Sequence, residues 1–227
     1  MTRVLDVIFS GLALLILSPL LIPLTVILRC TGEGEVFFVQ SRVGRNGNYF
    51  GLYKFATMLK DSPNIGSGTV TLKDDPRVLP VGKFLRATKI NELPQLLNIF
   101  LGDMSVIGPR PQTARCFEAF SEGAQKDIKK VKPGLSGVGS IVFRNEEAML
   151  AAHNDVDQFY DDVVMLYKGE LESWYVRNDT VGNYFVLIVL TMLVLFTRSS
   201  RLIYKVYPSV PRPPLSLKLF IDSENYE

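Results

Sequence analysis

The sequence predicts an α/β domain, rich in helix with short strands, that attaches to a membrane as a monotopic domain through an N-terminal re-entrant helix. Three observations predict this class: an uncharged apolar run at 7–28, short aromatic and β-branched runs at 37–55, and helical spacing of apolar residues after residue 80. At 227 residues the chain has room for one sizeable domain and a membrane attachment. We expect a membrane helix at 1–30, the main domain at 31–180, an apolar interfacial helix at 181–203 and a tail at 204–227.

The N-terminal run is long enough to cross a bilayer and too long for a signal peptide, and no small-residue cleavage site follows it. Pro19 and Pro23 remove two backbone donors and predict a sharp kink, where the Ser18 hydroxyl can bond a freed carbonyl. Arg3 and Arg29 flank the run, so both of its ends favour the same side of the membrane. This favours a re-entrant helix broken at Ser18-Pro19 over a through-span, which stays open.

The next segments predict a hairpin, a loop and an interrupted helix. VFFVQ and YFGLYKF read as strands joined by the turn GRNGN, and Asp75-Pro76 reads as a turn. Apolar residues at helical spacing predict a helix over 81–101 with a break near Pro94. Asn91 and Glu92 therefore lie within one turn of a helix break.

The stretch GDMSVIGPRP predicts a turn, a short strand and a rigid loop that presents Arg110. A single guanidinium on a rigid loop suits a phosphate or carboxylate, although a structural ion pair explains it equally well. An amphipathic helix is expected over 112–130, and then a strand at SIVF. Arg144 follows this strand and begins an acidic cluster that predicts a helix N-terminus.

The C-terminal part starts with a helix that carries Glu172 and then becomes apolar at 184–196. This apolar run is short for a span and suits a helix in the membrane interface, flanked by Arg198 and Arg201, with a buried core helix as the alternative. The Pro-rich and then acidic end predicts a tail without chemistry.

Charge and cysteine content exclude other classes. The net charge of +2, without a concentrated basic face, predicts no nucleic-acid partner. Cys30 and Cys116 form no CxxC pair, so we expect neither a zinc site nor a disulfide framework. His153 lies in a polar run, which favours a solvated histidine over a general base.

The order of short motifs along the chain resembles the bacterial sugar transferase family, the monotopic phosphoglycosyl transferases. The motifs are Ser18-Pro19 in an apolar segment, QSRVG, KFxTM, DPRV, RxTxxxELPQ, GDMS, GPRP and KPGLSG, and they run in order from about residue 4 to residue 197. Each motif alone is weak, whereas the ordered set is specific.

The resemblance implies transfer of a sugar-1-phosphate from a UDP-sugar to undecaprenyl phosphate, with Mg²⁺ present and UMP released. Such a reaction begins capsule, exopolysaccharide or O-antigen assembly at the cytoplasmic face of a bacterial inner membrane, with 31–180 as the cytoplasmic catalytic domain and membrane lipid as a partner. By matching position, Arg86, Arg110 and Arg144 are candidates for phosphate contacts, with structural ion pairs as the alternative. Glu172 stands where the family usually has an Asp thought to lie close to the nucleotide.

The chain departs from the family at the catalytic dyad, where Asn91 and Glu92 replace the usual Asp-Glu. A carboxamide is a poor nucleophile, so three mechanisms stay open. In the first, Glu92 is the nucleophile or a metal ligand and Asn91 orients the substrate, and in the second the lipid phosphate attacks directly while Glu92 holds the metal. In the third, catalysis is impaired. Asp103 is a second candidate metal ligand. The rival function is a catalytically impaired membrane scaffold in polysaccharide assembly. The sequence leaves open the sugar and the oligomeric state, a homodimer included.

Overall fold

The structure is a computed structural model that describes residues 2–31, 33–64, 75–144, 146–151, 155–197 and 199–222. His153 and Arg198, to which the sequence assigned a surface position and a flanking charge, lie outside the described residues. The α-helices are α1 (Thr2–Cys30), α2 (Pro80–Ala87), α3 (Gln95–Leu101), α4 (Ala114–Glu118), α5 (Glu122–Ile128), α6 (Val138–Val142), α7 (Glu146–Ala151), α8 (Val156–Phe159), α9 (Leu166–Arg177), α10 (Val181–Thr197), α11 (Leu202–Val206) and α12 (Leu215–Asp222). The strands are β1 (Phe37–Val43), β2 (Tyr49–Phe55), β3 (Ser105–Ile107) and β4 (Gly134–Ser136). Shorter helical turns lie at η1 (Arg45–Gly47), η2 (Ser62–Asn64), η3 (Ile90–Glu92) and η4 (Tyr160–Met165).

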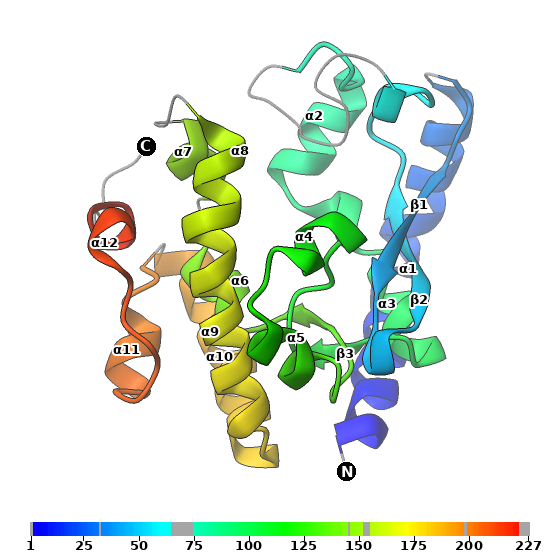
Figure 1. The fold of residues 1–227 in the computed structure, drawn as a ribbon. Coiled ribbons are helices and arrows are strands. Elements are labelled where there is room, and N and C mark those ends of the chain that lie inside the picture. Colours follow the sequence, from blue (N-terminus) through cyan, green and yellow to red (C-terminus); the bar gives the residue numbers. More distant parts are fainter. Residues whose placement is uncertain are drawn as a thin grey trace.

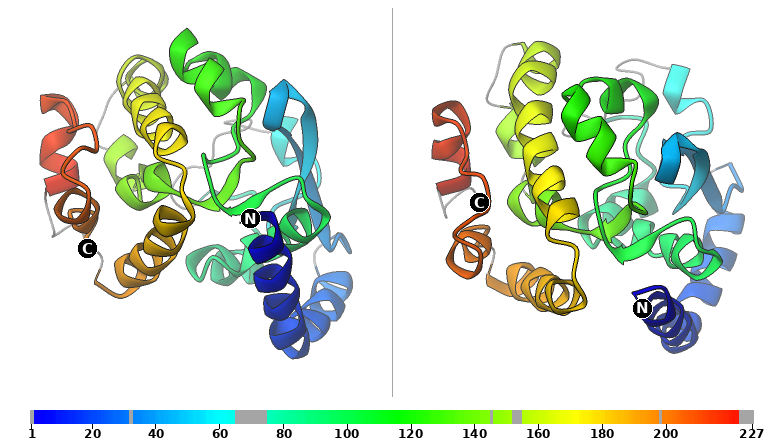
Figure 2. Two further views of the ribbon diagram at one scale, coloured as in Figure 1. Left: turned by 90° about the horizontal axis from the view of Figure 1, so that it is seen from below. Right: turned by 60° about the horizontal axis from the view of Figure 1, so that its bottom comes forward.

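The helix α1 contains both prolines of the apolar run and is assigned as one continuous helix. The hydroxyl of Ser18 donates to the carbonyl of Leu15 at 2.8 Å, as expected for a serine beside a helix proline. The two halves of α1 run in different directions (Figure 2). Within the described residues, α1 is the one helix long and apolar enough to cross a membrane by length and composition.

The predicted hairpin forms from β1 and β2, which pair antiparallel with Phe38 opposite Lys54 and Arg42 opposite Phe50. The turn between them includes Asn46 and Gly47 at positive φ, which Asn and Gly adopt more readily than other residues. Figure 1 shows the hairpin and α1 on one side of the molecule, with α9 and α10 on the other.

The predicted helix over 81–101 is interrupted as expected, although it breaks over several residues. The end of α2 is followed by Lys89 in the left-handed conformation, then by the 3₁₀ turn η3, and Pro94 precedes α3. Proline is accepted at the start of a helix because the first amides have no partner inside it. Asn91 and Glu92 are consequently carried by a short turn between two helices.

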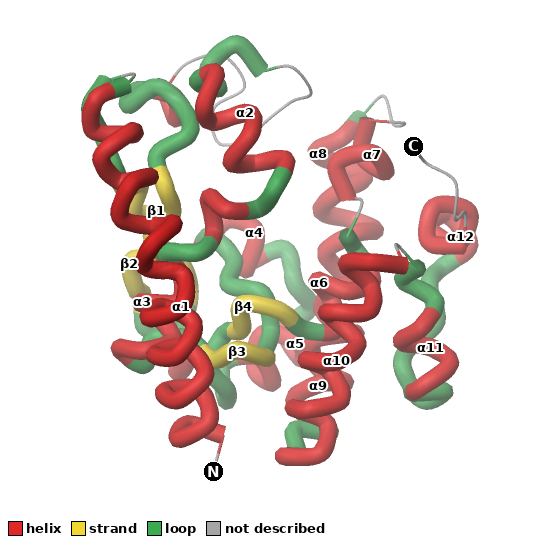
Figure 3. Tube along the Cα trace, turned by 180° about the vertical axis from the view of Figure 1, so that it is seen from behind, coloured by secondary structure: helices red, strands yellow, loops and turns green. Residues whose placement is uncertain are grey.

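A second small sheet lies between the two sides of the molecule (Figure 3). Its strands β3 and β4 are parallel, with Ser105 opposite Gly134 and Ile107 opposite Ser136. A Cβ on Gly108 would lie 2.6 Å from the Lys132 carbonyl oxygen, so the backbones approach closely at a glycine. The strand predicted at 105–107 is confirmed.

The strand expected at SIVF is wrong, because these residues belong to α6 and its C-terminal end. Val138, Ile141 and Val142 are buried on the α6 surface that packs against α9 and α10. β-branched residues can be buried in a core either as a strand or as a helix, so their presence alone does not determine the secondary structure. In this chain, packing against α9 and α10 favours the helix. The helix predicted to begin in the acidic cluster is confirmed as α7.

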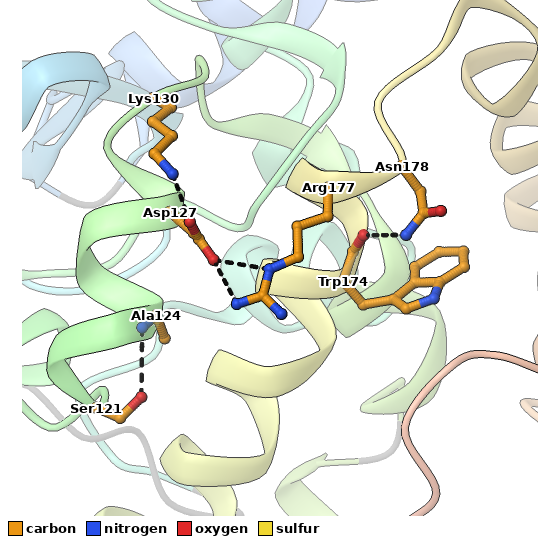
Figure 4. Close-up of polar contacts among 7 residues, drawn as sticks. All are labelled: Ser121, Ala124, Asp127, Lys130, Trp174, Arg177 and Asn178. Carbon is orange, nitrogen blue, oxygen red and sulfur yellow. Dashed lines mark hydrogen bonds and ion pairs between the residues drawn. The ribbon is translucent and has the colours of Figure 1, made fainter.

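The helix expected over 112–130 is divided into α4 and α5, each with its own N-cap. Thr113 accepts from the Cys116 amide, and Ser121 accepts from the Ala124 amide. A cap side chain satisfies an amide that has no partner inside the helix, so Ser121 begins a second helix where apolar spacing alone indicates continuity. Figure 4 shows this cap beside the ion pair that joins α5 to α9.

The helix α10 is apolar on both faces. Tyr184, Leu187 and Leu190 are buried in the core cluster, whereas Phe196 is 81% exposed and Val189 is 56% exposed. The core-helix alternative from the sequence describes the buried face, and the interfacial position of the exposed face stays a prediction.

The segment expected to be a tail forms α11 and α12 and packs on the domain. Val210 and Leu217 are buried and belong to the same core cluster as α10. The prolines between these helices limit the length of each helix without preventing their packing.

Candidate active site

The carboxylate of Glu92 lies among cations from two other elements. Its Oε1 is 3.9 Å from the Nζ of Lys54 on β2 and 3.4 Å from Nη2 of Arg110 in the loop after β3. The Glu92 side chain is 20% exposed and that of Arg110 is 41% exposed, so solvent reaches the group. The turn η3 brings Glu92 to the strand, and the rigid loop brings Arg110 to Glu92.

Glu92 is ionised at neutral pH. Burial acts to raise its pKa, but the charges of Arg110, Lys54 and Lys89 outweigh burial and bring the pKa of Glu92 below its usual value. The same contact raises the pKa of Arg110, chiefly through the Glu92 charge. The pair therefore carries both charges over the physiological pH range.

Lys54 and Arg42 add positive charge that Glu92 alone does not balance. Burial, with further contributions from Arg110, Arg42 and Arg86, lowers the pKa of Lys54 to about 8 although Glu92 opposes the shift. Burial and the Arg110 charge lower the pKa of Arg42 to about 10. Cations that destabilise one another in this way favour the binding of a multiply charged anion such as a pyrophosphate.

Asn91 is buried at 7% exposure. Within the described part of the chain its Oδ1 atom is buried and has no hydrogen-bond partner. A buried acceptor without a partner is costly, and such atoms are often explained by a ligand, water or ion. Asn91 can therefore offer a neutral oxygen ligand beside the charged Glu92.

The remaining predicted residues are dispersed. Arg86 is 3.7 Å from the Met58 sulfur and contributes to the potential at Lys54. Arg144 donates to the carbonyls of Val194 and Leu195 near the end of α10. The role of Arg144 at a phosphate stays a prediction.

Asp103 and Glu172 make hydrogen bonds with other parts of the chain. Asp103 is exposed in the turn after α3, where Asn98 donates to its Oδ2 at 3.4 Å. Glu172 is 3% exposed, and its Oε1 accepts from the backbone amide of Arg110 at 3.2 Å. Burial raises the pKa of Glu172 to about 7.

Lys54 and Arg42 were not among the residues that the sequence predicted for the site. The pairing register of the β1–β2 hairpin is the feature of the sequence that could have placed these two residues together. Cross-strand partners share a face and alternate residues share a face. Arg42 is opposite Phe50, and Lys54 belongs to the pair four positions further along, so the two cations lie on the same face of the sheet.

The residues present fit a magnesium ion only together with a phosphate ligand. Among the described residues, no group of three or more His, Cys, Asp or Glu side chains could hold a metal ion. Mg²⁺ is commonly held by one or two carboxylates together with substrate phosphates and water. Glu92 supplies one such carboxylate, and Asn91, the residue before it, has a side-chain oxygen without a partner among the described residues.

The fold and this cluster define a protein with a helix that could anchor it to a membrane and a site suited to a phosphate-bearing ligand. The chain belongs to the bacterial sugar transferase family, whose model, described as "Bacterial sugar transferase", matches residues 1–198.

Several curated proteins are similar to the chain. It is 33% identical over 210 residues to the undecaprenyl-phosphate galactose phosphotransferase of Salmonella typhimurium, covering 86% of this chain and 40% of that protein. It is 38% identical over 143 residues to the UDP-glucose:undecaprenyl-phosphate glucose-1-phosphate transferase of Klebsiella pneumoniae, covering 61% of this chain and 30% of that protein. It is 35% identical over 158 residues to the exopolysaccharide production protein ExoY of Sinorhizobium fredii, covering 63% of this chain and 70% of that protein.

The chain thus spans less than half the length of the first two of these relatives. Nothing in these comparisons supports the non-catalytic scaffold that the sequence left as the alternative function.

Proposed function

We propose that this chain transfers a sugar-1-phosphate from a UDP-sugar to undecaprenyl phosphate and so begins capsule, exopolysaccharide or O-antigen assembly. The observation that carries the proposal is an ionised, partly exposed Glu92 among Lys54, Arg42 and Arg110. The names of the relatives support the same reaction class.

The cations suit the donor pyrophosphate, whose negative charge otherwise repels a nucleophile. Arg110 and Lys54 would bind its oxygens, stabilise the charge that develops on transfer and hold the phosphate in line. Mg²⁺ would be held by Glu92 and Asn91 together with the pyrophosphate, and would supply further charge neutralisation.

In the covalent route, a Glu92 carboxylate oxygen attacks the phosphorus that carries the sugar. The new bond joins this oxygen to that phosphorus, while the bond to the UMP oxygen breaks and UMP leaves with the electron pair. An oxygen of the lipid phosphate then attacks the same phosphorus and returns the carboxylate. In the direct route, the lipid phosphate attacks the bound donor and Glu92 only binds and orients.

The lipid acceptor explains the attachment of the domain to a membrane, since acceptor and product both stay in the bilayer. We infer that α1 enters and leaves the cytoplasmic face of a bacterial inner membrane and that the exposed face of α10 lies at the interface. An apolar helix with aromatic residues suits that position.

We predict that the purified chain, with Mg²⁺ and undecaprenyl phosphate, releases UMP from at least one UDP-sugar. The panel should include galactose, glucose and N-acetylgalactosamine donors, because relatives named for all three are similar to this chain. Glu92→Gln should lower kcat by about 100-fold or more, because it removes the charge at the centre of the site. Asn91→Ala should keep more activity than Glu92→Gln.

The exposed Glu122 on α5 supplies the control, and Glu122→Gln should match the wild type. Labelling of the protein by a donor radiolabelled in the sugar, without acceptor, would favour the covalent route, and its absence during active turnover would favour direct attack. If no donor yields UMP while Asn91→Asp releases it, the wild-type chain is an impaired enzyme and the proposed activity is wrong.

A further inference from the structure

We propose that Glu172 and Arg42 are positioning residues that hold the Gly-Pro-Arg-Pro loop from both sides and so place the Arg110 guanidinium beside Glu92. Glu172 on α9 accepts from the Arg110 amide at 3.2 Å, and Arg42 on β1 donates from Nη1 to the Pro111 carbonyl at 3.2 Å. The contribution of these residues to turnover rests on the proposed function, whereas their effect on the loop does not.

The loop depends on these contacts because its own amides are few. Pro109 and Pro111 have no N–H, so Arg110 has the single amide of the tripeptide 109–111. The neighbouring backbone is held by the amide of Gly134, which donates to Pro109, and by the amide of Val43, which donates to Gln112. The carboxyl of Glu172 supplies the acceptor that completes this set at Arg110.

Close packing against α6 fixes the position of the Glu172 carboxyl group. A Cβ on Gly139 of α6 would lie 2.4 Å from the Glu172 Oε1 atom, so this glycine leaves the space that the carboxyl occupies. Within the residues the structure describes, the other carboxyl oxygen, Oε2, is buried without a partner. Among the described residues, the carboxyl of Glu172 therefore holds the chain through Oε1, which accepts from the Arg110 amide.

Arg42 fixes the other flank of Arg110. Its Nη2 donates to Gln40 Oε1 at 2.6 Å, which holds the guanidinium on the hairpin while Nη1 reaches Pro111. Because Glu172 and Arg42 belong to different elements, the loop joins α9 to the β1–β2 hairpin. Arg110 then contacts Glu92 from a backbone that is fixed on both sides, which is the arrangement that precise orientation of a site residue requires.

The first test measures hydrogen exchange at the Arg110 amide in the full chain in nanodiscs, with no substrate present. Glu172→Leu should accelerate exchange about fivefold or more, the effect of losing one ordinary hydrogen bond. Glu172→Gln keeps a carbonyl acceptor and should exchange at close to the wild-type rate. Glu170→Leu, at an exposed position on the same helix, is the matched control, and Glu172→Met replaces Glu172→Leu if that variant does not fold.

The second test is a double-mutant cycle on UMP release. Glu172→Leu should lower kcat/KM about 10-fold or more in the wild type, but less than about twofold in an Arg110→Met background, because Glu172 acts through Arg110. Arg42→Met also removes a charge from the site, so its loss should be smaller in the Arg110→Met background than in the wild type without disappearing. Glu172→Gln should restore most of the activity. Arg115→Met removes an exposed arginine on α4 and is the control for Arg42→Met.

The outcomes separate the two proposals. Unchanged Arg110 exchange in Glu172→Leu, or equal losses of kcat/KM in both backgrounds, would overturn the positioning role. A wild-type chain that releases no UMP would overturn the proposed function alone, and the exchange measurement would still decide the role of Glu172. If Arg110→Met leaves no measurable turnover, the double-mutant cycle cannot be completed, and the hydrogen-exchange measurement alone tests the positioning role of Glu172.

Discussion

Two glutamates lie on opposite sides of Arg110, and their environments shift their pKa values in opposite directions. Glu92 meets the guanidinium and Lys54, and its pKa falls although burial opposes this. Glu172 meets the Arg110 backbone, and burial raises its pKa to about 7 in spite of Lys168 and Arg110. Such a separation indicates different roles, with Glu92 as the permanent charge and Glu172 as an acceptor that becomes largely neutral as pH falls below 7.

This separation predicts a pH-dependent stability. An acid with a raised pKa in the folded state keeps its proton while the unfolded chain loses it, so the contribution of Glu172 falls as pH rises from 4.5 to about 7. Across that window wild type should lose on the order of 3 kcal/mol of unfolding free energy relative to Glu172→Gln. Denaturant unfolding of both proteins at pH 4.5, 6 and 7.5 measures the difference.

Glu170→Gln, an exposed neighbour on α9, is the control and should follow wild type at each pH. A difference between wild type and Glu172→Gln that stays constant over the three values would contradict a buried, protonated Glu172.

At the scale of elements, the sequence predicted what depends on local chemistry. The hairpin turn, the break before Pro94 and the strand after GDM each follow from turn residues or alternation near the site. The helices α6, α11 and α12 were not predicted, because their formation depends on packing in a core built from distant segments. Local pattern does not contain that information.

The candidate site divides in the same way. Arg110 could be predicted from the proline-bounded loop that presents it, whereas Glu92 was predicted because it stands at the position of the family dyad. Lys54 and Arg42 could not, since their proximity to Glu92 depends on how the hairpin packs against the turn η3. Register placed them on one face, but nothing local showed which element that face meets.

The contact between α5 and α9 supports a prediction about element packing (Figure 4). Asp127 accepts from Lys130 Nζ at 2.6 Å and from Arg177 Nη2 at 2.9 Å, and these bonds lower its pKa although burial opposes them. Asp127→Asn should cost about 1 kcal/mol of unfolding free energy at pH 7, a modest value because both partner side chains are largely exposed. Urea unfolding at pH 7 measures the cost.

The direction in which the stability difference between wild type and Asp127→Asn changes with pH tests whether the ion pairs of Asp127 cause it. A carboxylate with a lowered pKa stabilises the fold above its ordinary value of 3.8 and loses this contribution as pH falls through the lower folded value. The gap between wild type and Asp127→Asn should therefore narrow below pH 3.8. Glu118→Gln, at an exposed site on α4, should show no gap, and a gap that widens in acid would refute the ion-pair explanation.

At the scale of the whole molecule, both ends of α1 are attached to the domain. Near the start, Arg3 donates to the carbonyl of Phe100, and Asp6 accepts from the Ser105 hydroxyl and the Tyr184 hydroxyl. Near the end, Leu24 and Leu28 pack in a cluster that includes residues of β2 and α2. A helix fixed at both ends to one domain is expected to return to the side on which the domain lies.

We therefore predict that both ends of α1 are labelled from the same side of the membrane. In a chain whose two native cysteines are replaced by serine, Thr2→Cys and Arg45→Cys should react with an impermeant maleimide in inside-out vesicles and stay protected in right-side-out cells. Ser18→Cys should react poorly in both preparations, because this position lies in the apolar middle of α1. A through-span would instead expose Thr2→Cys and Arg45→Cys in opposite preparations, and that result would exclude the re-entrant helix while leaving the contacts of Glu92 unaffected.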